Sequence, residues 1–100
     1  MELKSGVKLV GLHPELHLGL VIANEVYASH GVNMVITSVL DGKHSKTSLH
    51  YAGYAADLRI KNLGNTDPYD VAKEIKRRLG VDFDVIVESN HIHLEFQPRF

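Results

Sequence analysis

Two stretches of this chain contain the side-chain types that bind a catalytic metal ion. His50 and Asp57 lie in the first stretch, and His93 lies near the C-terminal end, within His91-Ile92-His93. Two imidazoles and one carboxylate form the ligand set of a catalytic zinc site, which keeps a fourth position open for water. These three residues therefore predict bound Zn²⁺ and hydrolytic chemistry.

Further polar residues near these ligands have the chemistry of catalytic groups. Glu88 precedes the two C-terminal histidines, and we expect its carboxylate to take a proton from the attacking water. His91 and His44 are candidate hydrogen-bond donors that would stabilise an oxyanion or orient the water. The sequence thus predicts a general base and two auxiliary residues beside the metal.

The composition predicts a single domain that spans residues 1–100. With 44% hydrophobic residues, a chain of this length buries roughly 60–70% of the surface that its unfolded form exposes, which is enough for one core. There is no cysteine, so a metal site must use histidine and carboxylate. The net charge of −1, with both signs dispersed, predicts neither a nucleic acid nor a membrane as partner.

Two helices are predicted from caps and periodicity. Pro14 suits a first helical position, and apolar residues recur at helical spacing until Gly31. A second helix begins at Asp67-Pro68, where Asp67 is a good N-cap, and ends at Gly80. The remaining histidines lie on the first helix or at its ends, where we expect capping or solvated roles: His13, His17 and His30.

Strands are predicted from apolar content and two-residue alternation. Alternation places Asp57 on the polar face of its strand, and His91 and His93 on the polar face of theirs. A tight turn at residues 89–90 puts Glu88 directly across from His91. Four of the five predicted strands cover residues 32–39, 54–60, 83–88 and 91–96. The order β-α-β-β-α-β-β predicts an α+β fold, in which a small antiparallel or mixed sheet carries helices on one face.

Residues 48–57 follow the pattern S-x-H-x-x-G-x-A-x-D through Ser48, His50, Gly53, Ala55 and Asp57. This pattern resembles the motif of the D-alanyl-D-alanine metallopeptidases, a group that includes phage L-alanyl-D-glutamate endolysins and the signalling domain of hedgehog proteins. The later run Glu-Ser-Asn-His-Ile-His is similar to a hedgehog segment, and the likeness covers about residues 8–97. The resemblance implies the fold of that group.

The resemblance also implies a role for each matching residue. His50 and Asp57 would be zinc ligands, and Glu88 would be the catalytic base. His44 and His91 would line the site as auxiliary residues. These implied roles agree with those expected from the residue types.

The third zinc ligand has two candidates. The hedgehog-like register and the apolar and acidic residues that follow favour His93. Many peptidases of this group instead place the acidic residue three positions before the ligand, and this spacing would pair Glu88 with His91. We expect His93 to be the ligand, with His91 as the alternative.

The activity implied by the resemblance is hydrolysis of peptidoglycan stem peptides by zinc-activated water, as a carboxypeptidase or an endopeptidase. The partner would be a peptidoglycan-derived peptide. The alternative is a hedgehog-like, zinc-stabilised binding module that cleaves nothing, and a third reading is a metal-free interaction domain. We expect a monomer made in the cytoplasm without a signal peptide, of phage or bacterial origin, which would act on the cell wall after release.

Overall fold

A computed structural model describes residues 1–9, 11–40 and 54–97 of the chain. Five strands and two α-helices in this part follow the order predicted from the sequence, and a short 3-10 helix precedes the second α-helix. The elements are β1 (Glu2–Leu3), α1 (Pro14–Ser29), β2 (Val35–Leu40), β3 (Ala55–Arg59), η2 (Lys61–Leu63), α2 (Pro68–Leu79), β4 (Phe83–Val87) and β5 (His91–Phe96).

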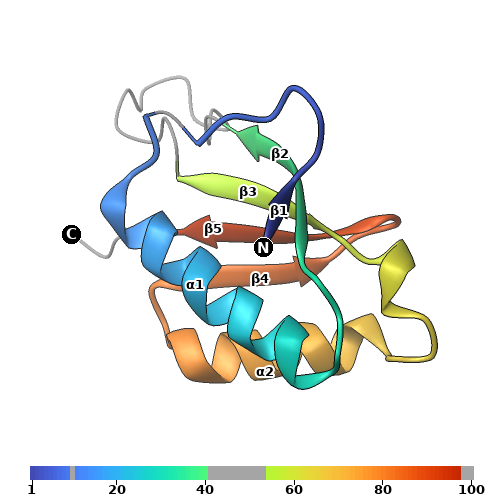
Figure 1. Cartoon of the computed structure of the whole chain (residues 1–100). Helices are drawn as coiled ribbons and strands as arrows, with labels where there is room; N and C mark the ends of the chain where they lie inside the picture. The colour runs from blue at the N-terminus through green and yellow to red at the C-terminus, as the bar shows by residue number, and fades with distance from the viewer. Residues whose placement is uncertain (10, 41–53, 98–100) are drawn as a thin grey trace.

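The strands form one mixed sheet in the order β1-β2-β3-β5-β4 (Figure 1). β1 pairs with β2 in parallel, and the other neighbours are antiparallel. α1 packs against β5 and α2, and α2 packs against β4. Both helices therefore cover one face of the sheet, and the α+β class predicted from the sequence is confirmed.

The core lies between this face and the helices. On β5, Ile92 and Leu94 are fully buried in the core and alternate with the polar residues of the strand. Gly19 of α1 lies against the ring of Phe83, because an added Cβ would stand only 2.7 Å from Phe83 Cε2. The missing side chain lets the helix approach the sheet closely, which anchors the hairpin that carries the candidate site.

Helix caps explain where the two helices begin and end. His13 Nδ1 accepts a hydrogen bond from the Glu15 backbone N–H at 3.2 Å, so the capping role expected for this histidine is confirmed. At α2, Asp67 Oδ1 accepts from the Tyr69 backbone N–H at 2.9 Å. Gly80 ends α2 with φ of 84°, a conformation that residues with a side chain rarely adopt.

Two segments differ from the prediction by more than one residue or in kind. β2 begins at Val35 rather than at residue 32, because the Val32 backbone N–H donates to the Tyr27 carbonyl at 3.1 Å and so belongs to the end of α1. The connection at residues 61–67, expected on the surface, contains η2 and buries Leu63. Both differences come from bonds and packing that a pattern of apolar residues does not reveal.

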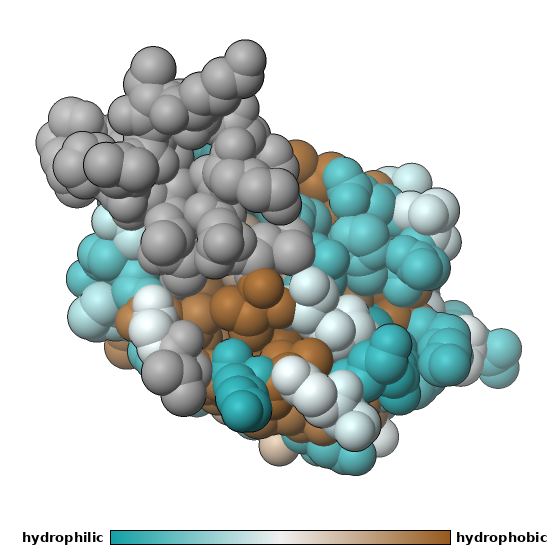
Figure 2. Space-filling view, turned by 90° about the horizontal axis from the view of Figure 1, so that it is seen from above, coloured by the Kyte–Doolittle hydropathy of each residue, from teal (hydrophilic) through white to brown (hydrophobic). Residues whose placement is uncertain are grey.

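The surface mixes hydrophobic and hydrophilic residues. Seen from above, the described surface has a hydrophobic area with hydrophilic residues on both sides (Figure 2). In the described part of the chain, no helix has the length and apolar character needed to cross a membrane. The exposed large apolar side chains are dispersed along the described chain, as is normal for a protein of this size: Met1, Leu3, Leu18, Val21, Tyr69, Val81 and Ile86.

Candidate functional site

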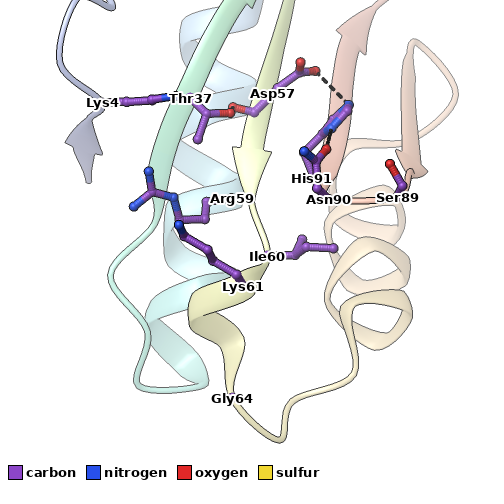
Figure 3. A pocket seen from close by; sticks show the side chains of 10 residues that line it. All are labelled: Lys4, Thr37, Asp57, Arg59, Ile60, Lys61, Gly64, Ser89, Asn90 and His91. Atoms are coloured by element: carbon purple, nitrogen blue, oxygen red, sulfur yellow. Dashed lines mark hydrogen bonds and ion pairs between the residues drawn. The ribbon is translucent and has the colours of Figure 1, made fainter.

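The structure brings four of the six predicted site residues together. Asp57, Glu88, His91 and His93 lie on or beside β3 and β5, on the sheet face that points away from the helices. Figure 3 shows Asp57 and His91 on this face, with the helices behind the strands. The other two, a predicted zinc ligand and a predicted auxiliary residue, lie outside the described residues: His50 and His44.

The strand register explains why these side chains meet. β3 and β5 are antiparallel neighbours in which Asp57 stands directly opposite His93. Two-residue alternation then brings His91 to the same face as His93. The hairpin turn behaves as predicted, since the Glu88 backbone N–H donates to the His91 carbonyl at 2.8 Å.

The carboxylate of Asp57 lies between the two imidazoles. Its Oδ1 atom is 3.1 Å from His93 Nδ1 and 3.4 Å from His91 Nε2. His91 Nε2 also lies 2.8 Å from Glu88 Oε1. The side chains therefore form a continuous row, in which Glu88 at the exposed end is linked through His91 to Asp57 and His93.

The row ends at Glu95, which is not among the site residues predicted from the sequence. His93 Nε2 lies 2.9 Å from Glu95 Oε1, and the Gln97 side-chain amide donates to Glu95 Oε2 at 2.9 Å. Glu95 is 6% exposed, so its carboxylate depends on these partners. The signal was present in the sequence, because alternation from His91 through His93 leads directly to Glu95 on the same face.

The surroundings of His93 favour its charged form. Burial of the ring disfavours the charge, but hydrogen bonds with Glu95 and Asp57 and the charges of both carboxylates outweigh burial, so the pKa of His93 is raised above its usual range. Each ring nitrogen faces a carboxylate oxygen, and an imidazolium can donate to both. The charged form of His93 is therefore more stable in the metal-free protein than in a free imidazole.

The raised pKa of His93 predicts how the stability of the metal-free protein depends on pH. Because the pKa of His93 is higher in the folded than in the unfolded chain, the stabilisation is complete below the unfolded pKa of about 6.5 and is lost as the pH rises through the folded pKa. The free energy of unfolding should fall over this window by at most about 1.4 kcal/mol per pH unit for this proton.

Urea denaturation at a series of pH values, with a chelator present, measures this slope. The His93→Gln variant is the control, since it lacks the proton and leaves the other histidines in place. A slope that is identical in His93→Gln would show that His93 does not carry the proton.

The second imidazole has a different environment. His91 Nδ1 lies 2.6 Å from Asn90 Oδ1, a contact between neighbouring residues at the hairpin turn (Figure 3). This contact holds the ring so that Nε2 points toward Glu88 and Asp57, whose carboxylate oxygens can accept a hydrogen bond from it. The turn thus orients His91, whereas Asp57 and Glu95 orient His93.

Imidazole nitrogens and carboxylate oxygens are donor types that zinc binds in proteins. Two ligands of a tetrahedral zinc ion at about 2.1 Å from the metal lie about 3.4 Å from one another. The separations of Asp57 Oδ1 from His93 Nδ1 and from His91 Nε2, 3.1 and 3.4 Å, are close to this value. No three His, Cys, Asp or Glu side chains among the described residues are arranged to hold a metal ion. The predicted set also requires His50.

Searches of protein-family models, of curated proteins and of solved structures find no match to this chain. Assignment of a function therefore depends on the motif residues and on the geometry of the row from Glu88 to Glu95.

Proposed function

We propose that this protein is a zinc-dependent peptidase that hydrolyses peptide bonds in peptidoglycan stem peptides. The observation that carries the proposal is the position of Asp57 Oδ1, between His93 Nδ1 and His91 Nε2, with Glu88 on the other side of His91. The match of residues 48–57 to the metallopeptidase motif supports the choice of substrate.

The charge of the row supports a cation as its natural partner. Three carboxylates share two imidazoles along the row, so a net negative charge remains even when both imidazoles are protonated: Glu88, Asp57 and Glu95 with His91 and His93. In the proposal, Asp57, His93 and His50 hold the zinc. Bound zinc supplies a Lewis acid and makes water nucleophilic near neutral pH.

Glu95 would prepare His93 for this role. If His93 keeps its proton on Nε2 and donates it to Glu95 at 2.9 Å, the neutral ring presents Nδ1 toward Asp57. A hydrogen bond from a carboxylate to the second nitrogen is the usual way in which proteins orient a histidine ligand and raise its basicity. Glu95 is therefore a positioning residue in the proposal.

Glu88 would act as the base. Its side chain is 51% exposed and can meet a water molecule from solvent, whereas Glu95 is enclosed. The contact with His91 Nε2 holds the carboxylate toward Asp57. Glu88 would accept the proton of the attacking water and pass it to the leaving amine, while His91 and His44 assist as hydrogen-bond donors.

Metal analysis combined with product detection tests the proposal. The protein purified without added metal should contain about one zinc per chain, and mass spectrometry should detect cleaved products from defined muropeptides. Removal of the metal with a chelator should abolish cleavage, and added Zn²⁺ should restore it.

Other outcomes would reject the proposal in distinct ways. Bound zinc with no cleavage of a broad muropeptide panel would favour the zinc-stabilised binding module. Cleavage that survives complete removal of the metal would reject zinc as the source of the activity. A chain that takes up no zinc would favour the metal-free interaction domain.

A further inference from the structure

A pocket opens beside the candidate site on the same face of the sheet (Figure 3). Its volume is about 720 Å³, which is within the usual range for pockets that bind small ligands. Asp57 and His91 line one side of it. The pocket is therefore continuous with the row of residues proposed to carry out catalysis.

Three cationic side chains line the other side of this pocket: Lys4, Arg59 and Lys61. In the described part of the chain, none of the three makes an ion pair or a side-chain hydrogen bond, although Arg77 and Arg78 on α2 both pair with glutamates. The whole chain has a net charge of −1, so this gathering of positive charge is local. Unpaired cations around a pocket favour an anionic ligand.

Arg59 is held in place by the core. The buried side chain of Tyr27 donates its O–H to the Arg59 carbonyl at 2.8 Å, which ties this end of β3 to α1. Arg59 also stands opposite His91 in the β3–β5 register. Its planar guanidinium has the geometry to bind a carboxylate through two parallel hydrogen bonds.

The distance along β3 gives the scale of the ligand. Arg59 follows Asp57 by two residues, and two residues of a strand span about 7 Å. An extended peptide also advances about 7 Å over two residues. A group bound at Arg59 would thus lie within about two substrate residues of a bond positioned at Asp57.

We propose that Lys4, Arg59 and Lys61 form an anion subsite that binds a carboxylate of the peptide substrate within about two residues of the scissile bond. This inference rests on the proposed peptidase function, because that function places the scissile bond beside Asp57. The subsite would make the enzyme selective for peptides with free carboxylates over the same peptides with those carboxylates amidated.

Binding measurements with two matched peptides test the subsite without requiring turnover. The peptides are a stem tetrapeptide with free carboxylates and its fully amidated form, each titrated by calorimetry into zinc-loaded full-length protein that carries Glu88→Gln. Addition of Arg59→Gln should weaken binding of the free acid about tenfold and leave the amidated peptide nearly unchanged.

Further variants separate the subsite from a general effect of charge. Lys4→Gln and Lys61→Gln alter exposed side chains and should each weaken the free acid severalfold, even if Arg59→Gln disturbs the sheet. Lys73→Gln removes the same charge from an exposed position on α2 and should change neither affinity. High salt should weaken only the binding of the free acid.

Several results would overturn the subsite. These are equal losses for both peptides, the same loss in Lys73→Gln, and no binding of the free acid to the protein that keeps all its cations. Charge-dependent binding in a chain that hydrolyses nothing would support the subsite and reject the peptidase. Hydrolysis without preference for the free acid would support the peptidase and reject the subsite.

Discussion

Replacing Glu88 with glutamine should lower the turnover of muropeptides by about 10²- to 10⁴-fold while leaving zinc bound. Glutamine has nearly the same shape, and its amide oxygen can still accept a hydrogen bond from His91 Nε2, which lies 2.8 Å from Glu88 Oε1 in the native protein. It cannot accept the proton of the attacking water. The expected loss is in the rate of hydrolysis, measured by mass spectrometry of the products beside a determination of zinc content.

The chain offers a matched control for this variant. Glu74 on α2 also contacts a basic side chain three positions later, that of Arg77, and the Glu74 side chain is similarly exposed. Glu74→Gln should retain full turnover, because Glu74 lies on a helix that covers the opposite face of the sheet. Full activity in Glu88→Gln would remove Glu88 from the mechanism, and equal losses in both variants would indicate a general effect of charge.

Local patterns predicted most of the elements, because the signals that begin and end them lie within a few residues. Asp67 caps α2 and Gly80 ends it, as expected from side-chain and backbone preferences at helix ends. The turn between β4 and β5 also follows from two adjacent residues, and it placed Glu88 beside His91 correctly.

The arrangement of the strands could not be predicted in the same way. β3 pairs with β5, although α2 and β4 lie between them in the chain, and only this pairing places Asp57 opposite His93. Such pairings depend on packing between distant segments. The same pairing brings Arg59 opposite His91. Local sequence patterns therefore could not predict the basic side of the pocket either.

The burial of Glu95 illustrates a different limit. Alternation correctly assigned this residue to the polar face of β5, and a polar face normally suggests contact with solvent. The structure instead encloses the carboxylate and joins it to His93 and Gln97. A two-residue period shows which face a side chain occupies, but the exposure of that face depends on the rest of the fold.

Separate alanine substitutions of the two C-terminal histidines should decide which one is a zinc ligand. His93→Ala should weaken zinc binding by more than about 100-fold, since loss of a residue that merely supports a ligand already costs about 10- to 100-fold. His91→Ala should retain zinc within about tenfold and lose most of the turnover. Competition with a chelating indicator measures the affinity, and circular dichroism checks that both variants are folded.

The structural reason for this expectation is the asymmetry of the row. His93 stands directly opposite Asp57 in the sheet, its ring is oriented by Glu95, and its side chain is 12% exposed. Of the two histidines, His91 is the one that contacts Glu88, the proposed base, and it lies at the hairpin turn. A ligand gains from an enclosed and fixed position, whereas a group that assists proton transfer must reach the base and the substrate.

The opposite result would change the mechanism in a defined way. If His91→Ala loses zinc and His93→Ala keeps it, the ligand is the histidine three residues after Glu88, the spacing found in many peptidases of the group that this chain resembles. Glu88 Oε1 would then contact Nε2 of the zinc ligand His91 directly. The contacts of His93 with Asp57 and Glu95 would serve to orient Asp57. Glu95→Gln distinguishes the two arrangements, because it should weaken zinc binding about 10- to 100-fold only if His93 is the ligand.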